Sequence, residues 1–184
     1  YQDHPAVSPA FAHVVLERLE SFERDWRFGY DHLRKYTAER LRLAELNLQK
    51  TMQKEEAPAL DLKIALSEAR LRELKTRRYI PLMEEAAASM KKRIEDEKKE
   101  NNTYLIKLLE NDLLKQTIEL EKLTTEAALW DLKQQEVTAR LENNETEQSA
   151  QEVREKRAEL QETLEKLEIR RQIAELNDQI RWEE

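Results

Sequence analysis

Residues 103–141 read TYLIKLLENDLLKQTIELEKLTTEAALWDLKQQEVTARL and contain the most regular hydrophobic pattern of the chain. Apolar or uncharged residues recur alternately every three and four positions, so that they share one side of an α-helix. Gln116, Ala127 and Gln134 fill the remaining steps of the pattern. A heptad seam of this kind packs against another helix. The seam is predicted to contain Ile106, Leu109, Leu113, Leu120, Leu123, Trp130, Val137 and Leu141.

The composition extends this helical assignment to the whole chain. Among 184 residues there are one glycine, four prolines and no cysteine, and 39% of the residues are charged. Turns depend on glycine and proline, so the chain has too few of them for the many turns of a sheet protein. Ala, Glu, Lys, Leu, Arg and Gln dominate, as in long helices and coiled coils. We therefore predict an all-α protein of long helices, in coiled-coil or elongated antiparallel helical-bundle packing.

Prolines and asparagines divide the chain into four predicted segments. Residues 1–57 form an N-terminal lead-in and an aromatic-rich long helix, and 58–100 form a proline-kinked helix with basic clusters. Residues 101–142 form the heptad helix, and 143–184 form an acidic coiled-coil helix. Pro58 predicts a break and Pro81 a kink, because proline cannot donate the helical hydrogen bond. Asparagines at 101–102 and 143–144 mark the other two boundaries.

Two architectures are compatible with these boundaries. In the first, the breaks are turns, and helices of about 40 residues fold side by side. In the second, the helix is continuous, and Asn102 and Asn144, 42 residues apart, occupy equivalent seam positions that fix register. The loss of phase after Asn144 favours a turn there, whereas the sequence leaves Asn102 open.

The hydrophobic seams also change phase within the outer segments. In the last segment a seam of Leu160, Leu164 and Leu167 shifts to Ile169, Ile173, Leu176 and Ile180. In the first, the pattern drifts to Leu41, Ala44, Leu48 and Met52. Such a shift is typical of a stutter, or of a seam that turns to a different neighbour. The shifts therefore suggest more than one partner surface.

Aromatic residues gather near the N-terminus, where seven of the eleven lie within the first 36 residues. One interpretation is that they fill a thicker end of the bundle, with at least three helices in contact. The other is a binding hot spot, because buried Trp and Tyr dominate interface energies. Gly29 would let another backbone approach this helix. The candidate partner-binding residues are Phe22, Trp26, Phe28, Tyr30, Leu33 and Tyr36.

Charge and motif content argue against several classes of function. A net charge of −7 makes general binding to nucleic acid unexpected, and no apolar run is long enough to cross a membrane. The three histidines lack helical metal-ligand spacing, and one glycine cannot make a phosphate-binding loop. We expect no catalytic, cofactor or metal site, and therefore no enzyme. The absence of cysteine fits an intracellular, cytoplasmic protein.

The function expected from these features is that of a structural scaffold or tether. Such a module would assemble or space the subunits of a larger complex, with other coiled-coil subunits or a second copy of itself as partners. Residues 58–100 carry eleven basic and nine acidic residues, the only net-positive segment. This raises two alternatives, a curvature-binding helical dimer that resembles BAR domains and a cytoskeleton-binding coiled coil. Membrane contact is not favoured, because acidic residues lie among the lysines.

Overall fold

The computed structural model describes the backbone of residues 9–53, 57–143 and 146–183, and the side chains of 29–53, 57–143 and 146–180. Within these ranges every regular element is an α-helix, which confirms the all-α class. The helices are α1 (Pro9–Met52), α2 (Pro58–Arg77), α3 (Ile80–Lys99), α4 (Thr103–Leu141) and α5 (Glu147–Glu183).

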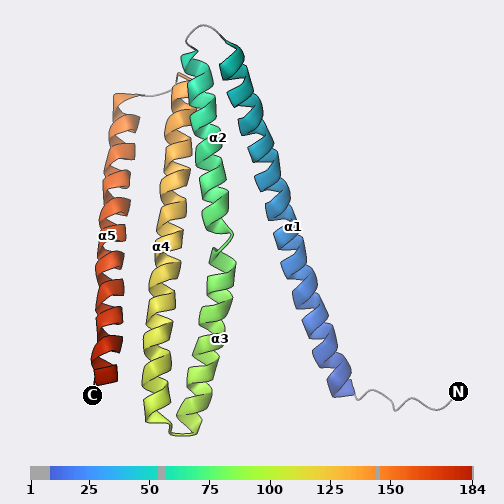
Figure 1. The fold of residues 1–184 in the computed structure, drawn as a ribbon, viewed down its shortest axis with the longest axis vertical. Helices are drawn as coiled ribbons and strands as arrows, with labels where there is room; N and C mark the ends of the chain where they lie inside the picture. Colours follow the sequence, from blue (N-terminus) through green and yellow to red (C-terminus); the bar gives the residue numbers. More distant parts are fainter. Residues whose placement is uncertain (1–8, 54–56, 144–145, 184) are drawn as a thin grey trace, which may run out of the picture.

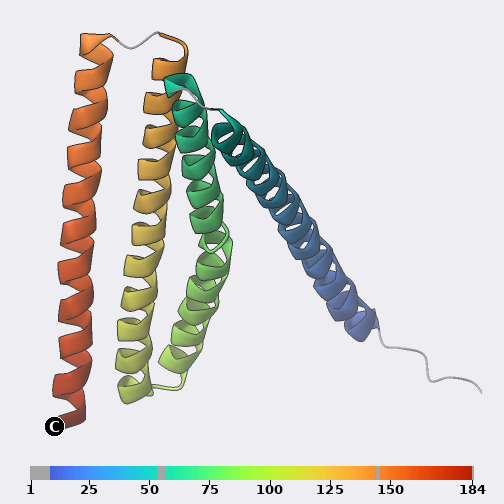
Figure 2. The same cartoon turned by 45° about the horizontal axis from the view of Figure 1, so that its top comes forward.

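The described helices form an open row and not a closed bundle (Figure 1). α4 lies in the row between α5 and the pair α2 and α3, which follow one another end to end. Over the part of the chain that the structure describes, α1 contacts only α2 and α5 contacts only α4, so these two helices are the edges of the row. α1 also leans away from its neighbours toward its N-terminal end, which is clear in both views (Figures 1 and 2).

The junction of α2 and α3 is a kink within a nearly continuous helix. Arg78 and Tyr79 keep right-handed helical dihedral angles, and the Met83 amide donates to the Tyr79 carbonyl at 3.0 Å. Pro81 lies in the first turn of α3, where its missing N–H costs least. The chain therefore bends here without a loop.

Two asparagines make the turn between α3 and α4. Asn101 has a φ of 57°, a left-handed conformation that asparagine tolerates at a helix C-terminus. The amides of Asn101 and Asn102 donate to the carbonyls of Lys98 and Glu97, as in a Schellman motif. The Asn102 side chain then accepts a hydrogen bond from the Leu105 amide and caps α4. Asn102 is thus in a turn, and the continuous-rod alternative is wrong at this point.

α4 has two buried faces on opposite sides of the helix. One follows the predicted heptad seam and contacts α2, where the Arg72 guanidinium lies 4.9 Å from the Trp130 ring centroid. The other faces α5, and its central residue Ile118 forms a buried cluster with Leu167 and Ala174 of α5. α4 is therefore covered along both sides.

Candidate binding cleft

A cleft of about 780 Å³ opens where α1 diverges from the α2–α3 kink. Leu33 and Tyr36 of α1 lie on one wall, and Tyr79 and Leu82 lie on the other. Its volume is within the range of sites that hold an organic ligand or a group of side chains. We call this hollow the α1–α3 cleft.

The α1 wall is positioned by the seam that holds α1 against α2. His32, Tyr36, Glu39, Leu43 and Leu46 follow one another at steps of four and three, and each is at least partly buried. Buried Ser67 of α2 donates a hydrogen bond to the Glu39 carboxylate at 2.5 Å. This seam keeps α1 beside α2 at the level where the cleft begins.

The opposite wall is positioned by the kink at Pro81. The kink lies beyond the end of the α1–α2 seam, where α1 has no contact with α3 among the described residues. Leu82 is therefore 59% exposed, although it is a large apolar residue, and Leu33 across the cleft is 60% exposed. These side chains make an apolar surface that the described residues leave uncovered.

Charged side chains border the cleft with opposite signs. Lys75 and Arg78 lie at the α2 side, and Glu84 and Glu85 lie at the α3 side. Partial burial, followed by the charges of Arg78 and Lys35, lowers the pKa of His32 below its ordinary value of 6.5. Both effects favour the neutral form of the imidazole. The cleft has an apolar centre, one basic side and one acidic side.

The structure places three of the six predicted partner-binding side chains. Leu33 and Tyr36 line the cleft, whereas Tyr30 is 55% exposed on α1 outside its lining. The side chains of Phe22, Trp26 and Phe28 lie outside the described residues, as does most of the aromatic group. Within residues 29–52, α1 contacts α2 only, so the expected packing of three helices is not found there.

Gly29 has a different setting from the one that the sequence suggested. A Cβ atom at this position would meet nothing within 4 Å, so no neighbouring backbone requires the glycine. Gly29 instead lines the α1–α3 cleft, where it widens the hollow by one side chain.

All eleven predicted seam residues are buried or partly buried. Leu109, Val137 and Leu167 are buried, and the other eight are partly buried: Ile106, Leu113, Leu120, Leu123, Trp130, Leu141, Leu160 and Leu164. The residues of α4 and those of α5 belong to different contacts, because the predicted α4 seam faces α2 and α3.

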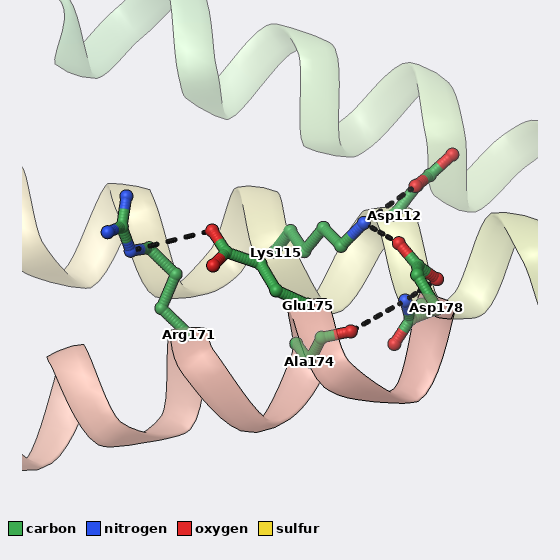
Figure 3. Close-up of polar contacts among 7 residues, drawn as sticks. Asp112, Lys115, Arg171, Ala174, Glu175 and Asp178 are labelled. Carbon is green, nitrogen blue, oxygen red and sulfur yellow. Dashed lines mark hydrogen bonds and ion pairs between the residues drawn. The ribbon is translucent and has the colours of Figure 1, made fainter. Parts of the chain in front are cut away.

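Sequence reasoning missed a polar cluster between α4 and α5 (Figure 3). Asn111, only 7% exposed, donates from Nδ2 to the Ala174 carbonyl at 3.4 Å and to the Asp178 carboxylate. Lys115 forms an ion pair with the same carboxylate. The sequence contains a second heptad pattern in α4 that includes Asn111, Lys115 and Ile118. This pattern does not stand out as hydrophobic, because Asn111 and Lys115 are polar.

A second ionic cluster joins the same two helices near the other end. Glu136 of α4 forms ion pairs with Arg157 of α5 and with Lys133 and Arg140 of its own helix. Burial alone raises the pKa of Glu136, but hydrogen bonds from Arg157 and Lys133 outweigh it and hold the pKa below 4.5. The two clusters fix the register of α5 on α4.

The basic residues of α3 are partly neutralised. Lys99 forms an ion pair with Asp96 at 2.8 Å, and Lys98 pairs with Glu110 of α4 at 3.6 Å. Among the described residues, no group of three or more metal-ligating side chains lies together. None of the helices, over the ranges described, has an apolar stretch long enough to cross a membrane.

Comparisons with protein-family models, with curated proteins and with solved structures find no match for this chain. A function must therefore be inferred from its own side chains.

Proposed function

We propose that the chain is a scaffold module whose α1–α3 cleft holds an amphipathic helix of a partner protein. The observation that carries this proposal is the pair of exposed leucines, Leu33 and Leu82, on facing walls of a cleft of about 780 Å³. Exposed apolar surface gathered in a hollow is typical of a binding site. A helix lying in a groove is a common way to cover such a surface.

The charges at the cleft define the chemistry of this partner helix. Its apolar face carries residues at helical spacing that reach Leu33 and Leu82. Acidic side chains along one flank lie near Lys75 and Arg78, and basic side chains on the other lie near Glu84 and Glu85. Complementary charge of this kind selects a partner and its direction more than it adds affinity.

The rest of the row serves as the rigid spacer of the scaffold. We propose that neighbouring helices contact each other through heptad seams, as in an antiparallel coiled coil. The 39 residues of α4 span about 60 Å at 1.5 Å per residue. A partner held in the cleft is thereby kept at a fixed distance from anything bound at the α5 edge.

A synthetic peptide tests the cleft directly. The probe is an amphipathic helix of about 20 residues, with leucines on one face, glutamates on one flank and lysines on the other. Fluorescence anisotropy measures its binding to the whole chain. We expect Leu33→Glu and Leu82→Glu to weaken binding about tenfold or more, because each puts a charge among the apolar anchors.

The matched control is Leu114→Glu, since Leu114 is also an exposed leucine, 40% exposed, but lies on α4. This variant should bind the peptide as the unchanged chain does. Equal binding to all three variants, or no binding to the unchanged chain, would contradict the proposal.

The membrane and cytoskeletal alternatives gain no comparable support from a specific arrangement of side chains. Sedimentation with vesicles of anionic lipid tests the first of them. Vesicle binding that Lys91→Glu and Lys92→Glu abolish, together with unchanged peptide binding in the Leu33→Glu variant, would favour the membrane alternative over the cleft.

A further inference from the structure

The edge helix α5 has two apolar faces, of which only one is covered. Leu160, Leu164, Leu167 and Ala174 lie on the face toward α4 and are partly or fully buried. Ile169, Ile173, Leu176 and Ile180 lie on the opposite side, because 3.6 residues per turn place them about half a turn away. We call these four residues the α5 outer stripe.

All four residues of the α5 outer stripe are exposed, with 53–57% of each accessible to solvent. Their spacing of four, three and four residues is that of the a and d positions of a coiled coil. Isolated exposed apolar residues are ordinary, but four large ones in heptad register on one helix face are not. The stripe has the form of an unpaired coiled-coil seam.

The residues beside the stripe indicate what covers it. With Ile173 and Ile180 at a positions, the flanking e and g positions within the stripe are Arg170, Gln172, Asn177 and Gln179. Three of the four are uncharged, so two identical stripes meet without repulsion between like charges. Isoleucine at both a positions with Leu176 at one d position favours a two-stranded coil, whereas Ile169 at the other d position does not add to this preference.

We propose that two copies of this chain pair in parallel through their α5 outer stripes. In this arrangement Glu165, at the g position before the stripe, faces Arg170 of the second copy at the following e position. Such g-to-e pairs of opposite charge set partner and direction in parallel coils. Arg170 already bonds to Glu121 of α4 at 2.8 Å, so its guanidinium would join both carboxylates.

The α5 outer stripe of a second copy covers this stripe better than the outer face of α1 of a second copy does. The outer face of α1 also carries apolar residues, namely Leu41, Leu48 and Met52, which are 61–75% exposed. That face covers 12 residues, as the α5 outer stripe does. Pairing α1 with α5 of another copy joins two different surfaces and produces an open chain of copies. Pairing α5 with itself covers both stripes and closes as a dimer.

This pairing goes beyond the proposed function, because it determines where the clefts of two paired copies lie. α1 lies at the opposite edge of the row from α5 (Figure 1). The α1–α3 cleft is lined by α1 and so lies at that edge too. The dimer therefore carries one open cleft at each end. Two tethered sites raise the overall affinity for a partner that presents two helices.

Sedimentation equilibrium of the whole chain tests the pairing. We expect a concentration-dependent species of twice the 22.0 kDa chain mass. Ile173→Glu and Leu176→Glu should raise the dissociation constant about tenfold or more, because each places a charge in the seam. Ile173→Ala, a milder change at an exposed position, should weaken the dimer less, and circular dichroism should show unchanged helix content in all three.

The control is Leu41→Glu on the outer face of α1, which should leave the dimer intact. A monomer at every concentration, or a dimer that the α5 changes do not affect, would overturn the proposal. Polymers that Leu41→Glu dissolves would overturn it in favour of α1–α5 pairing. Unchanged peptide binding by the Ile173→Glu variant separates this result from a failure of the cleft.

A single introduced cysteine tests the direction of pairing, since the chain has no cysteine of its own. In the parallel dimer Ile169→Cys faces the same residue of the second copy, and mild oxidation should yield a disulfide-linked dimer. In an antiparallel dimer residue 169 lies opposite residue 180, about 16 Å along the helix from its counterpart. That separation is too long for a disulfide. A dimer that fails to cross-link would overturn the parallel arrangement.

Discussion

At the scale of single residues, α5 is held on α4 by a few polar groups placed among small apolar ones. Ala174 is fully buried and leaves room for Asn111 to reach its carbonyl oxygen. Asp178 then accepts from both Asn111 and Lys115. A buried polar group of this kind costs stability when it loses its partners, and it permits only one register.

Replacing Asn111 by alanine tests this contact. We expect Asn111→Ala to lower the free energy of unfolding by about 1–2 kcal/mol, because the amide bonds to α5 are lost and a small cavity remains. Urea denaturation measures the change. The control Asn177→Ala alters an exposed asparagine of α5 and should change stability by less than about 0.5 kcal/mol. Equal effects of the two would show that the Asn111 contact contributes nothing.

The ion pairs of Glu136 should make the free energy of unfolding depend on pH. Its folded pKa lies below the ordinary 4.5, so its stabilising contribution is present above about pH 4.5 and is lost as pH falls through the folded pKa. We expect Glu136→Gln to cost about 1 kcal/mol at pH 7, since Arg157 and Lys133 are partly screened by water. The difference from the unchanged chain should shrink on acidification toward pH 3.

Urea unfolding of both proteins across this pH range measures the difference. Glu159→Gln, at an exposed carboxylate of α5 close to Arg157 in sequence, is the control and should give no such trend. A difference between Glu136→Gln and the unchanged chain that stays constant from pH 7 to pH 3 would contradict the assignment of the ion pairs to Glu136.

At the scale of elements, the sequence predicts which segments are helical but not which faces meet. The heptad pattern of α4 stands out because its seam toward α2 and α3 is mostly apolar. The second seam, toward α5, includes Asn111, Lys115, Lys122 and Glu136 and does not stand out as hydrophobic. Asparagines at 101–102 suit either a buried seam or a left-handed turn, and only the backbone conformation of Asn101 decides between them.

The cleft was predictable only in part for a related reason. The sequence drew attention to Leu33 and Tyr36 as members of an aromatic-rich segment. It contained no signal that Tyr79 and Leu82 would lie opposite them, because that depends on the angle of α1 to the Pro81 kink. An angle between two helices is set by packing over their whole contact and is not encoded at one position.

Gly29 provides a test at the level of α1. A glycine inside a helix costs about 0.5–1 kcal/mol relative to alanine, and nothing near Gly29 obstructs a methyl group. We therefore expect Gly29→Ala to raise the free energy of unfolding by that amount in urea denaturation. Gly29→Trp should instead fill the cleft and weaken binding of the amphipathic peptide. A destabilised alanine variant would mean that another backbone approaches this position after all.

At the scale of the whole molecule, the described helices form an open row with two uncovered edges. In a closed bundle α1 and α5 would cover each other, and the α1–α3 cleft and the α5 outer stripe would be buried. In the row they are separated by α2 and α4 and stay available for partners. Both the proposed scaffold function and the proposed dimer depend on this arrangement.

The most direct test is the distance between the two edge helices, measured by double electron–electron resonance. Spin labels are attached at Glu45→Cys on α1 and Glu152→Cys on α5, both exposed helix positions in a chain without cysteine. An excess of unlabelled protein removes distances between copies. Three interhelix spacings of 8–10 Å predict about 24–30 Å between the labelled helices. A distance of about 10 Å, as between helices in direct contact, would contradict the open row.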